Sequence, residues 1–217
     1  MKAQLNLFSN GLTGTDNSSA ILDKAVLKER IKNTHFQSAH PSFIIVKWEA
    51  GDELLPMYYT IEETPLGEVL IAATSKGITY LGFIVKDETK AIADVKKRFP
   101  ESNLMAGSTD WHIAAINRIE NPETEQPLHL HLKGTEYQLS IWEKLLLIPF
   151  GGVTNYKMLG DGNPDSREIG AAVGANPVGY LIPCHRVIRA DGNFYGFFWG
   201  NKVKAHLLTY EAVCAVN

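Results

Sequence analysis

The sequence predicts an α+β protein in which a small N-terminal α/β domain precedes a helical C-terminal domain. Between residues 57 and 85, three short runs rich in β-branched and aromatic residues are separated by Gly-containing turns, which is typical of an antiparallel meander. From residue 134 onward, apolar residues recur at helical spacing and the runs end at Gly or Pro. The expected domains are residues 57–133 and 134–217, and residues 1–56 form an unassigned N-terminal extension.

Composition narrows the class of protein. Hydrophobic residues make up 45% of the 217 residues and charged residues 21%, as in ordinary globular chains. No apolar run approaches the ~18–20 residues that span a bilayer, and residues 1–10 lack the apolar core of a signal peptide. We therefore expect a cytoplasmic protein without a membrane partner. The only cysteines, Cys184 and Cys214, cannot form a disulfide framework or a four-cysteine zinc site.

Charge is distributed unevenly along the chain. The net charge of −3 argues against strong, non-specific binding of nucleic acid. From His131 onward there are eight Lys and Arg against seven Asp and Glu, so this part carries +1 and the preceding part −4. A surface that faces DNA is therefore expected in the C-terminal part.

Local patterns predict the individual elements of the first 133 residues. A helix over residues 20–33, capped by Ser18 or Ser19, precedes a strand over residues 42–48. The α/β domain then contains strands over 57–63, 68–74, 78–85 and 128–132, and helices over 88–99 and 111–120.

The strand over 128–132 alternates strictly and places His129 and His131 on one face. Two imidazoles at this spacing could hold a metal ion, but the neighbouring sequence offers no third ligand. A solvent-exposed strand face is the favoured interpretation, and we expect neither a metal nor a cofactor.

The C-terminal domain is predicted to contain helices over 136–147, with Thr135 as N-cap, and over 155–159, 166–175 and 202–212. The two short helices on either side of the Gly- and Pro-containing break at 160–164 have the outline of a helix-turn-helix. Alone this is a weak signal, since many helical proteins contain such a pair.

The chemistry-bearing segment is Pro183-Cys184-His185-Arg186-Val187. An imidazole and a guanidinium close to a thiol both favour the thiolate, which is the nucleophilic form of cysteine. A bare Cys-His pair more often represents a half-buried cysteine with a surface histidine, so the flanking sequence has to decide.

Three ordered motifs flank this segment. They are GTEYQLSIWEKLLLIPFGGVTNY (134–156), SREIGAAVGA (166–175) and NPVGYLIPCHRVI (176–188). Together they resemble the O6-alkylguanine-DNA alkyltransferases, most closely the C-terminal module of adaptive-response (Ada) proteins, over residues 57–212. The resemblance implies a ribonuclease-H-like N-terminal domain and a helix-turn-helix in the helical domain.

The resemblance also implies an activity. The chain would repair double-stranded DNA by direct, stoichiometric and irreversible transfer of a methyl or other alkyl group from O6 of guanine to Cys184. O4-alkylthymine is a second candidate lesion, and a monomer without cofactor is expected. His185 would act as base through a water, Glu211 would orient the imidazole, and Tyr156 would stabilise charge on the leaving base. This is the nucleophile–base–orienter arrangement of catalytic triads.

Other residues match positions that contact DNA or support the site in the family. Arg167 would enter the stack that a flipped base vacates. Behind it, a run of small side chains would let the helix approach the minor groove, although tight helix packing explains small residues nearly as well: Gly170, Ala171, Ala172, Gly174 and Ala175. The supporting residues would be Asn176, Pro183, Arg186 and Val187, with the carbonyls of Cys184 and Val187 reading the guanine edge.

Two departures from the family pattern are visible. Tyr156 and Arg167 are eleven positions apart, which is closer than in the family, so the first helix of the helix-turn-helix is expected to be almost a turn shorter. Phe197 and Phe198 predict a more apolar base pocket. Two alternatives stay open: a non-catalytic, alkyltransferase-like protein that binds DNA lesions, and a cysteine hydrolase. Proteins of the first kind lack the cysteine, and hydrolases need an oxyanion hole.

Overall fold

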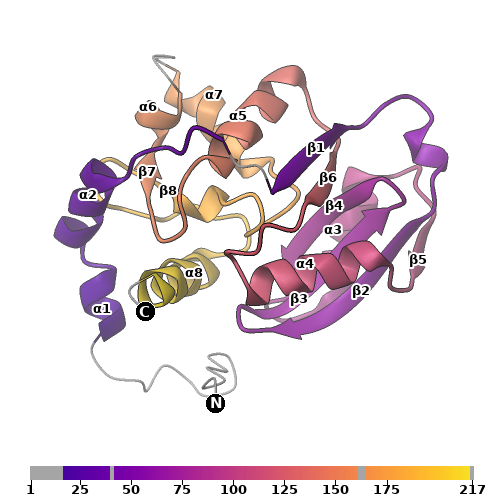
Figure 1. Cartoon of the computed structure of the whole chain (residues 1–217), viewed down its shortest axis with the longest axis horizontal. Coiled ribbons are helices and arrows are strands. Elements are labelled where there is room, and N and C mark those ends of the chain that lie inside the picture. Colours follow the sequence, from indigo (N-terminus) through magenta and orange to yellow (C-terminus); the bar gives the residue numbers. More distant parts are fainter. Residues whose placement is uncertain (1–16, 40–41, 161–164, 216–217) are drawn as a thin grey trace. The chain divides into compact units, whose positions relative to one another are not determined.

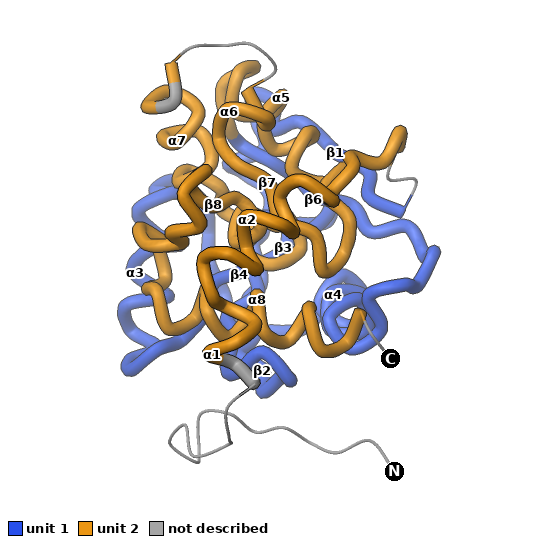
Figure 2. Tube along the Cα trace, turned by 90° about the vertical axis from the view of Figure 1, so that its left-hand side faces the viewer, with its two compact units in different colours: residues 1–13, 41–133 blue, residues 14–40, 134–217 orange. Residues whose placement is uncertain are grey.

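The computed structural model describes residues 17–39, 42–160 and 165–215, and these fall into two compact units (Figure 2). One unit contains residues 42–133, and the other combines residues 17–39 with residues 134–215. Of the N-terminal extension, residues 17–39 lie in the second unit and residues 42–56 in the first. The protein has a mixed α+β fold.

The first unit is built on a six-stranded sheet with the order β1-β6-β4-β3-β2-β5 (Figure 1). The central strands β2, β3 and β4 form the predicted antiparallel meander, and β1 pairs with β6 in parallel. The short strand β5, parallel to β2, was not predicted because three residues show no period. The bounds are β1 Phe43–Lys47, β2 Met57–Thr64, β3 Gly67–Thr74, β4 Gly77–Phe83, β5 Leu104–Ala106 and β6 Leu128–Leu132.

Two helices, α3 (Glu88–Arg98) and α4 (Asp110–Glu120), and the 3-10 turn η1 (Asp52–Leu54) complete this unit. In Figure 1, α4 crosses the near face of the sheet. The side chains of α3 close a hydrophobic core whose buried members are Met57, Leu70, Ala72, Tyr80, Ala91, Val95 and Phe99. Burial of this apolar surface is the main force that holds the helix to the sheet.

The expectation of a solvent-exposed strand face at the histidine pair was wrong for His131. His131 is completely buried, since β6 lies between β1 and β4. Its Nε2 lies 2.9 Å from Asp52 Oδ2, its Nδ1 lies 2.7 Å from Thr74 Oγ1, and its ring stacks on Trp48. These contacts make it a buried polar link between β6 and η1. Within the described residues, no three metal-ligating side chains gather at one place.

The second unit is mainly helical, and a two-stranded parallel sheet of β7 and β8 lies within it. Its elements are α1 Asn17–Ile21, α2 Lys24–Asn33, α5 Glu136–Leu146, β7 Thr154–Asn155, α6 Tyr156–Leu159, α7 Ser166–Gly174, the 3-10 turn η2 Cys184–Arg186, β8 Val187–Ile188 and α8 Asn201–Cys214. None of the helices in the described part of the chain is long and apolar enough to cross a membrane.

The single helix predicted over residues 20–33 is in fact two helices. Asp23 interrupts it and caps α2, because its carboxylate accepts hydrogen bonds from the backbone N–H groups of Ala25 and Val26 at 2.7 and 3.4 Å. Ser18 and Ser19 lie inside α1 and do not cap α2. Buried residues of α2 then join a small core made of Leu27, Ile31, Val153, Ile188 and Leu208.

Helix α5 begins at a capping box, in which Thr135 accepts a hydrogen bond from the backbone of Gln138 and the Gln138 side chain accepts one from Thr135 N–H. Helix α6 has only four residues, in line with the shortening expected from sequence. Residues 161–164 of the predicted break lie outside the described residues.

Candidate active site

Cys184 is the first residue of the 3-10 turn η2, and its side chain is 4% exposed. Its Sγ accepts a hydrogen bond from Asn176 Nδ2 at 3.1 Å. Burial raises the pKa of the Cys184 thiol, and the Asn176 hydrogen bond and the charge of Lys204 act in the opposite direction. The thiol is therefore protonated at rest and needs a base.

His185 is the nearest candidate base, and its ring is completely buried. Nε2 lies 2.8 Å from Glu211 Oε1, whereas Nδ1 is buried and has no hydrogen-bond partner among the described residues. Since an ionised carboxylate accepts from an N–H, the bond to Glu211 places the proton of the neutral ring on Nε2 and leaves the lone pair of Nδ1 available. Burial lowers the pKa of His185 and Glu211 raises it. The ring of Tyr180, a residue with φ +64°, stacks on the imidazole.

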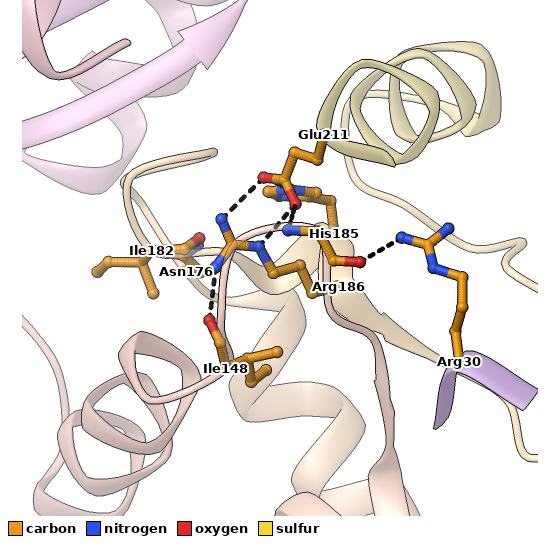
Figure 3. A network of polar contacts seen from close by, with 8 residues as sticks. Arg30, Ile148, Asn176, Ile182, His185, Arg186 and Glu211 are labelled. Atoms are coloured by element: carbon orange, nitrogen blue, oxygen red, sulfur yellow. Dashed lines mark hydrogen bonds and ion pairs between the residues drawn. The ribbon is translucent and has the colours of Figure 1, made fainter. Parts of the chain in front are cut away.

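Glu211 is the centre of a buried polar network (Figure 3). Besides His185, it accepts two hydrogen bonds of 2.8 Å from Arg186, and Gly151 N–H donates to its Oε2 at 3.2 Å. Burial opposes ionisation, but the charges of Arg186 and His185 and their hydrogen bonds outweigh it and lower the pKa of Glu211 to about 2. Glu211 is thus a carboxylate at neutral pH.

Arg186 has a different role from the one that its sequence position indicated. The sequence suggested that its guanidinium favours the thiolate of Cys184. In the structure, the guanidinium pairs with Glu211 and also donates to the carbonyl of Ile148 at 2.6 Å. It therefore neutralises Glu211, and its closeness to Cys184 in the sequence was misleading because its guanidinium is held by Glu211 and Ile148.

The cation that faces the thiol is Lys204, which the sequence analysis missed. Lys204 is 2% exposed and donates from Nζ to the carbonyl of Val187 at 2.6 Å. Burial lowers the pKa of Lys204 to about 8, against the opposing charge of Cys184. The sequence did contain a signal for Lys204, namely its spacing from Glu211. Residues seven apart lie on one face of a helix, and Lys204 and Glu211 interrupt the apolar face of α8.

The thiol lines a small pocket with a volume of about 40 Å³. Tyr156 lines the pocket, and burial and the Cys184 charge raise the pKa of its hydroxyl. Phe197 and Phe198 also line it, and both rings contact Trp199 at centroid distances of 5.3 and 5.2 Å. The full lining is Tyr156, Gly170, Val173, Gly174, Asn176, Cys184, Gly196, Phe197, Phe198, Trp199 and Lys204. Aromatic side chains therefore form much of the wall around the thiol.

Helix α7 presents a polar and small-sided surface beside this pocket. The side chain of Arg167 is 96% exposed, and its Nε lies 4.0 Å from the Asp165 carboxylate, which also caps the helix. Ala171 and Gly174 are exposed, and Gly170 and Ala175 are partly exposed. Ala172 is the exception among these small residues, since it is buried and its carbonyl accepts a hydrogen bond from Trp142. For Ala172 the helix-packing interpretation holds.

The remaining predicted residues hold the turn around the cysteine. The Asn176 side chain donates to the carbonyls of Val178 and Ile182 and accepts from Val178 N–H. Pro183 precedes the η2 turn as its N-cap, and the carbonyl of Cys184 accepts from the N–H of Val187.

Cys214 is an exposed residue at the end of α8. The sequence had placed it beyond this helix. It does not line the Cys184 pocket.

Fold and site together define a protein with a buried cysteine at a small pocket, and comparisons with known proteins specify the family. A family model described as "6-O-methylguanine DNA methyltransferase, DNA binding domain" matches residues 136–213. The methylated-DNA–protein-cysteine methyltransferase of Methanosarcina acetivorans is 33% identical over 161 residues, which cover 73% of this chain and 100% of that protein. The chain belongs to the family of methylated-DNA–protein-cysteine methyltransferases.

Further relatives extend the comparison. The bifunctional transcriptional activator/DNA repair enzyme Ada of Escherichia coli is 32% identical over 75% of this chain, and the chain spans about half (47%) of Ada. The O6-methylguanine methyltransferase of Mycobacterium tuberculosis has a similar structure, with a TM-score of 0.57 and 28% identity over 72% of this chain and 93% of that one. A crystal structure of the M. tuberculosis protein in complex with DNA aligns equally well, with a TM-score of 0.57.

Proposed function

We propose that this chain repairs DNA by transferring an alkyl group, usually methyl, from O6 of guanine to its own Cys184. The observation that carries the proposal is the buried Cys184 thiol at a small pocket, adjacent to an imidazole whose Nδ1 is unpartnered among the described residues and whose Nε2 is held by Glu211. The names of the relatives support this activity, and O4-alkylthymine is a second candidate lesion. No cofactor takes part in the proposed reaction.

The chemistry follows from these contacts. His185 Nδ1 takes the proton of the Cys184 thiol, through a water, and Glu211 stabilises the imidazolium that forms. The thiolate attacks the methyl carbon, so a C–S bond forms while the C–O bond to guanine breaks and its electron pair stays on the base. Tyr156 donates a hydrogen bond to the base as charge develops, and solvent returns the proton to guanine. Because the product is a stable thioether, each chain reacts once.

DNA binding is assigned to the helix-turn-helix formed by α6 and α7 in the helical unit. Once the base is flipped, the exposed side chain of Arg167 occupies the space that the base leaves in the stack. Its contacts there offset the few kcal/mol that unstacking the base costs. Among the described residues outside α7, a Cβ on Gly174 would meet no atom within 4 Å, and one on Gly170 would meet only Tyr156, at 3.8 Å. Packing within the chain therefore does not require these glycines, which supports their use in a close approach to the minor groove.

The proposal includes three further parts. Residues 57–133 form the ribonuclease-H-like N-terminal domain of the alkyltransferase, and residues 134–217 form its alkyl-transfer and DNA-binding domain. The protein acts on double-stranded DNA as a monomer.

Intact-mass analysis tests the function directly. The purified chain is incubated with duplex DNA that contains O6-methylguanine, and with the unmodified duplex as control. A gain of one methyl group, located on Cys184 by peptide mapping, supports the proposal. Binding of the methylated duplex without a change in mass would instead indicate a non-catalytic lesion-binding protein, and neither binding nor transfer would reopen the possibility of a cysteine hydrolase.

A further inference from the structure

Helix α2 of the N-terminal extension reaches the active-site network through one side chain. Arg30 is partly buried, and its Nη2 donates to the carbonyl of Gly151 at 2.5 Å. The N–H of the same residue, Gly151, donates to Glu211 Oε2 at 3.2 Å. A chain of two hydrogen bonds therefore runs from Arg30 through Gly151 to the carboxylate that holds His185 (Figure 3).

A second contact fixes the same turn from α2. Thr34 directly follows the helix and donates its hydroxyl to the carbonyl of Arg30 at 2.7 Å. The same hydroxyl accepts a hydrogen bond from Val153 N–H at 3.0 Å. The turn at Gly151 and Gly152 is thus tied at two points to α2 and to the residue that follows it. Farther along the chain, Gln37 N–H donates to the carbonyl of Leu147, at the end of α5, at 2.8 Å.

Steric contacts restrict the backbone conformation of the turn at Gly151 and Gly152. Gly151 has φ +73°, and a Cβ added there would lie 2.8 Å from the Cβ of Ala215. Helix α2 also approaches the loop after β8 closely, because a Cβ on Gly192 would lie 2.7 Å from the carbonyl oxygen of Lys24. Leu27 and Ile31 of α2 are buried and pack in the small hydrophobic core that also contains Val153 and Ile188. Helix α2 is therefore packed against the segments on both sides of the site, and not merely attached to the surface.

The charge of Arg30 also acts on Glu211. Burial lowers the pKa of Arg30, and the charge of Glu211 raises it. Glu211 is thus near two guanidinium groups, one that binds it directly and one that acts through Gly151. Removing a cation from this position would weaken the field that keeps the buried carboxylate ionised.

We infer that Arg30 is a positioning residue for alkyl transfer, which fixes Glu211 through Gly151, and that α2 belongs to the transfer machinery of this chain. This inference rests on the proposed function. Arg30 touches neither the thiol nor the base, so its effect is expected on the chemical step and not on DNA binding.

The test compares Arg30→Met with the matched control Lys32→Met. Lys32 is on the same helix, 71% exposed and paired only with Glu29 at 3.0 Å, a surface pair of small value. We measure the single-turnover rate constant at saturating methylated duplex, and separately the Kd for that duplex. Arg30→Met should lower the rate constant about tenfold, the size of one charge-assisted hydrogen bond, while Kd stays within twofold. Lys32→Met should change neither quantity.

A pH profile separates positioning from a purely structural role. The rate at which iodoacetamide alkylates Cys184 is followed against pH by peptide mass. A less firmly held Glu211 stabilises the imidazolium less, so the profile of Arg30→Met should move to higher pH. Loss of stability alone would lower the midpoint of thermal unfolding without moving this profile. An unchanged profile and an unchanged rate constant in folded Arg30→Met would overturn the inference, and so would equal losses in Lys32→Met.

Two further variants keep the test decisive. If Arg30→Met does not fold, Arg30→Lys retains the charge and the aliphatic stem but loses the planar guanidinium, and Thr34→Val removes the neighbouring tie. A normal rate constant in both would refute the inference. The iodoacetamide profile needs no DNA, so it still tests the link between Arg30 and Cys184 if the wild-type chain fails to take up a methyl group, an outcome that would count against the proposed function alone.

Discussion

The carboxylate of Glu211 accepts a hydrogen bond from His185 Nε2 at 2.8 Å, and neither side chain is exposed to solvent. The same carboxylate is paired with Arg186. Glu211 therefore has two tasks: it holds the imidazole of His185, and it balances the charge of a buried guanidinium. A change at Glu211 should affect chemistry and stability together.

Replacing Glu211 by Gln should raise the apparent pKa of the Cys184 thiol and slow alkyl transfer, because a neutral amide no longer stabilises the imidazolium. It should also lower the free energy of unfolding by about 3–5 kcal/mol, since Arg186 loses its buried counter-charge. Urea unfolding and thiol alkylation against pH measure the two effects. An unchanged thiol profile would remove Glu211 from the mechanism.

The pH dependence of stability follows from the same group. The pKa of Glu211 is about 2 in the folded chain, against an ordinary value of 4.5, so its ionised form stabilises the fold. This contribution is complete above about pH 4.5 and is lost as pH falls towards 2. The difference in unfolding free energy between the wild type and Glu211→Gln should therefore shrink over that interval. A difference that stays constant would mean that Glu211 titrates normally in the fold.

Replacing Lys204 by Met should slow the reaction of the Cys184 thiol while leaving stability unchanged or raised, because a buried cation is replaced by an apolar side chain of similar length. In the wild type, Lys204 loses its charge as pH rises through about 8, so its help to the thiolate should decline above that pH. Lys204→Arg serves as the charge-retaining control. Equal alkylation rates of the wild type and Lys204→Met at pH 7 would contradict a role for Lys204.

The two cysteines should behave differently. Cys184→Ala should abolish methyl transfer and leave the affinity for DNA nearly unchanged, because the thiol provides the acceptor atom and no phosphate contact. Cys214→Ala should be nearly silent, since Cys214 is an exposed residue at the end of α8. Peptide mapping after reaction with methylated duplex shows which cysteine carries the methyl group. A methyl group on Cys214 would refute the site assignment.

Arg167→Ala should impair repair of duplex DNA more than reaction with the free methylated base. Flipping a base from a duplex costs a few kcal/mol, whereas a free base needs no flipping. The side chain is 96% exposed and only 4.0 Å from Asp165, so its removal should hardly affect the fold. Rate constants on both substrates provide the comparison. Equal losses on the two would show that Arg167 is not used in flipping.

Gly174→Gln should weaken DNA binding without destabilising the protein. Outside its own helix and neighbouring residues, a Cβ at this position would meet no atom of the described residues within 4 Å, and replacing glycine in a helix gains up to about 1 kcal/mol. Gly160→Ala is the contrasting control, because its Cβ would lie 2.3 Å from Ile169, and it should destabilise the protein. Duplex affinity and thermal unfolding are measured for both variants. Unchanged affinity in Gly174→Gln would exclude α7 as a close-approach surface.

The sequence predicted elements well where a local signal exists. Helix α5 was predicted because Thr135 and the apolar spacing after it define a helix start, and the meander was predicted because its turns contain Gly. The break between α1 and α2 was missed because apolar and helix-forming residues continue on both sides of Asp23, although Asp is a favoured N-cap residue. The burial of His131 was missed because strict alternation indicates one exposed face, whereas in the structure Trp48 and Asp52 cover His131 on that face.

The sequence alone determined the family and the identity of the nucleophile candidate, because the motif around Cys184 is contiguous in the chain. Only the tertiary structure decided which charges act on it. Arg186 is two residues away yet pairs with Glu211, whereas Lys204, twenty residues away, lines the thiol pocket. It likewise brought Arg30, from an extension without recognisable motifs, to the turn that binds Glu211. Electrostatic coupling depends on distance and burial in space, and neither is encoded in the local order of residues.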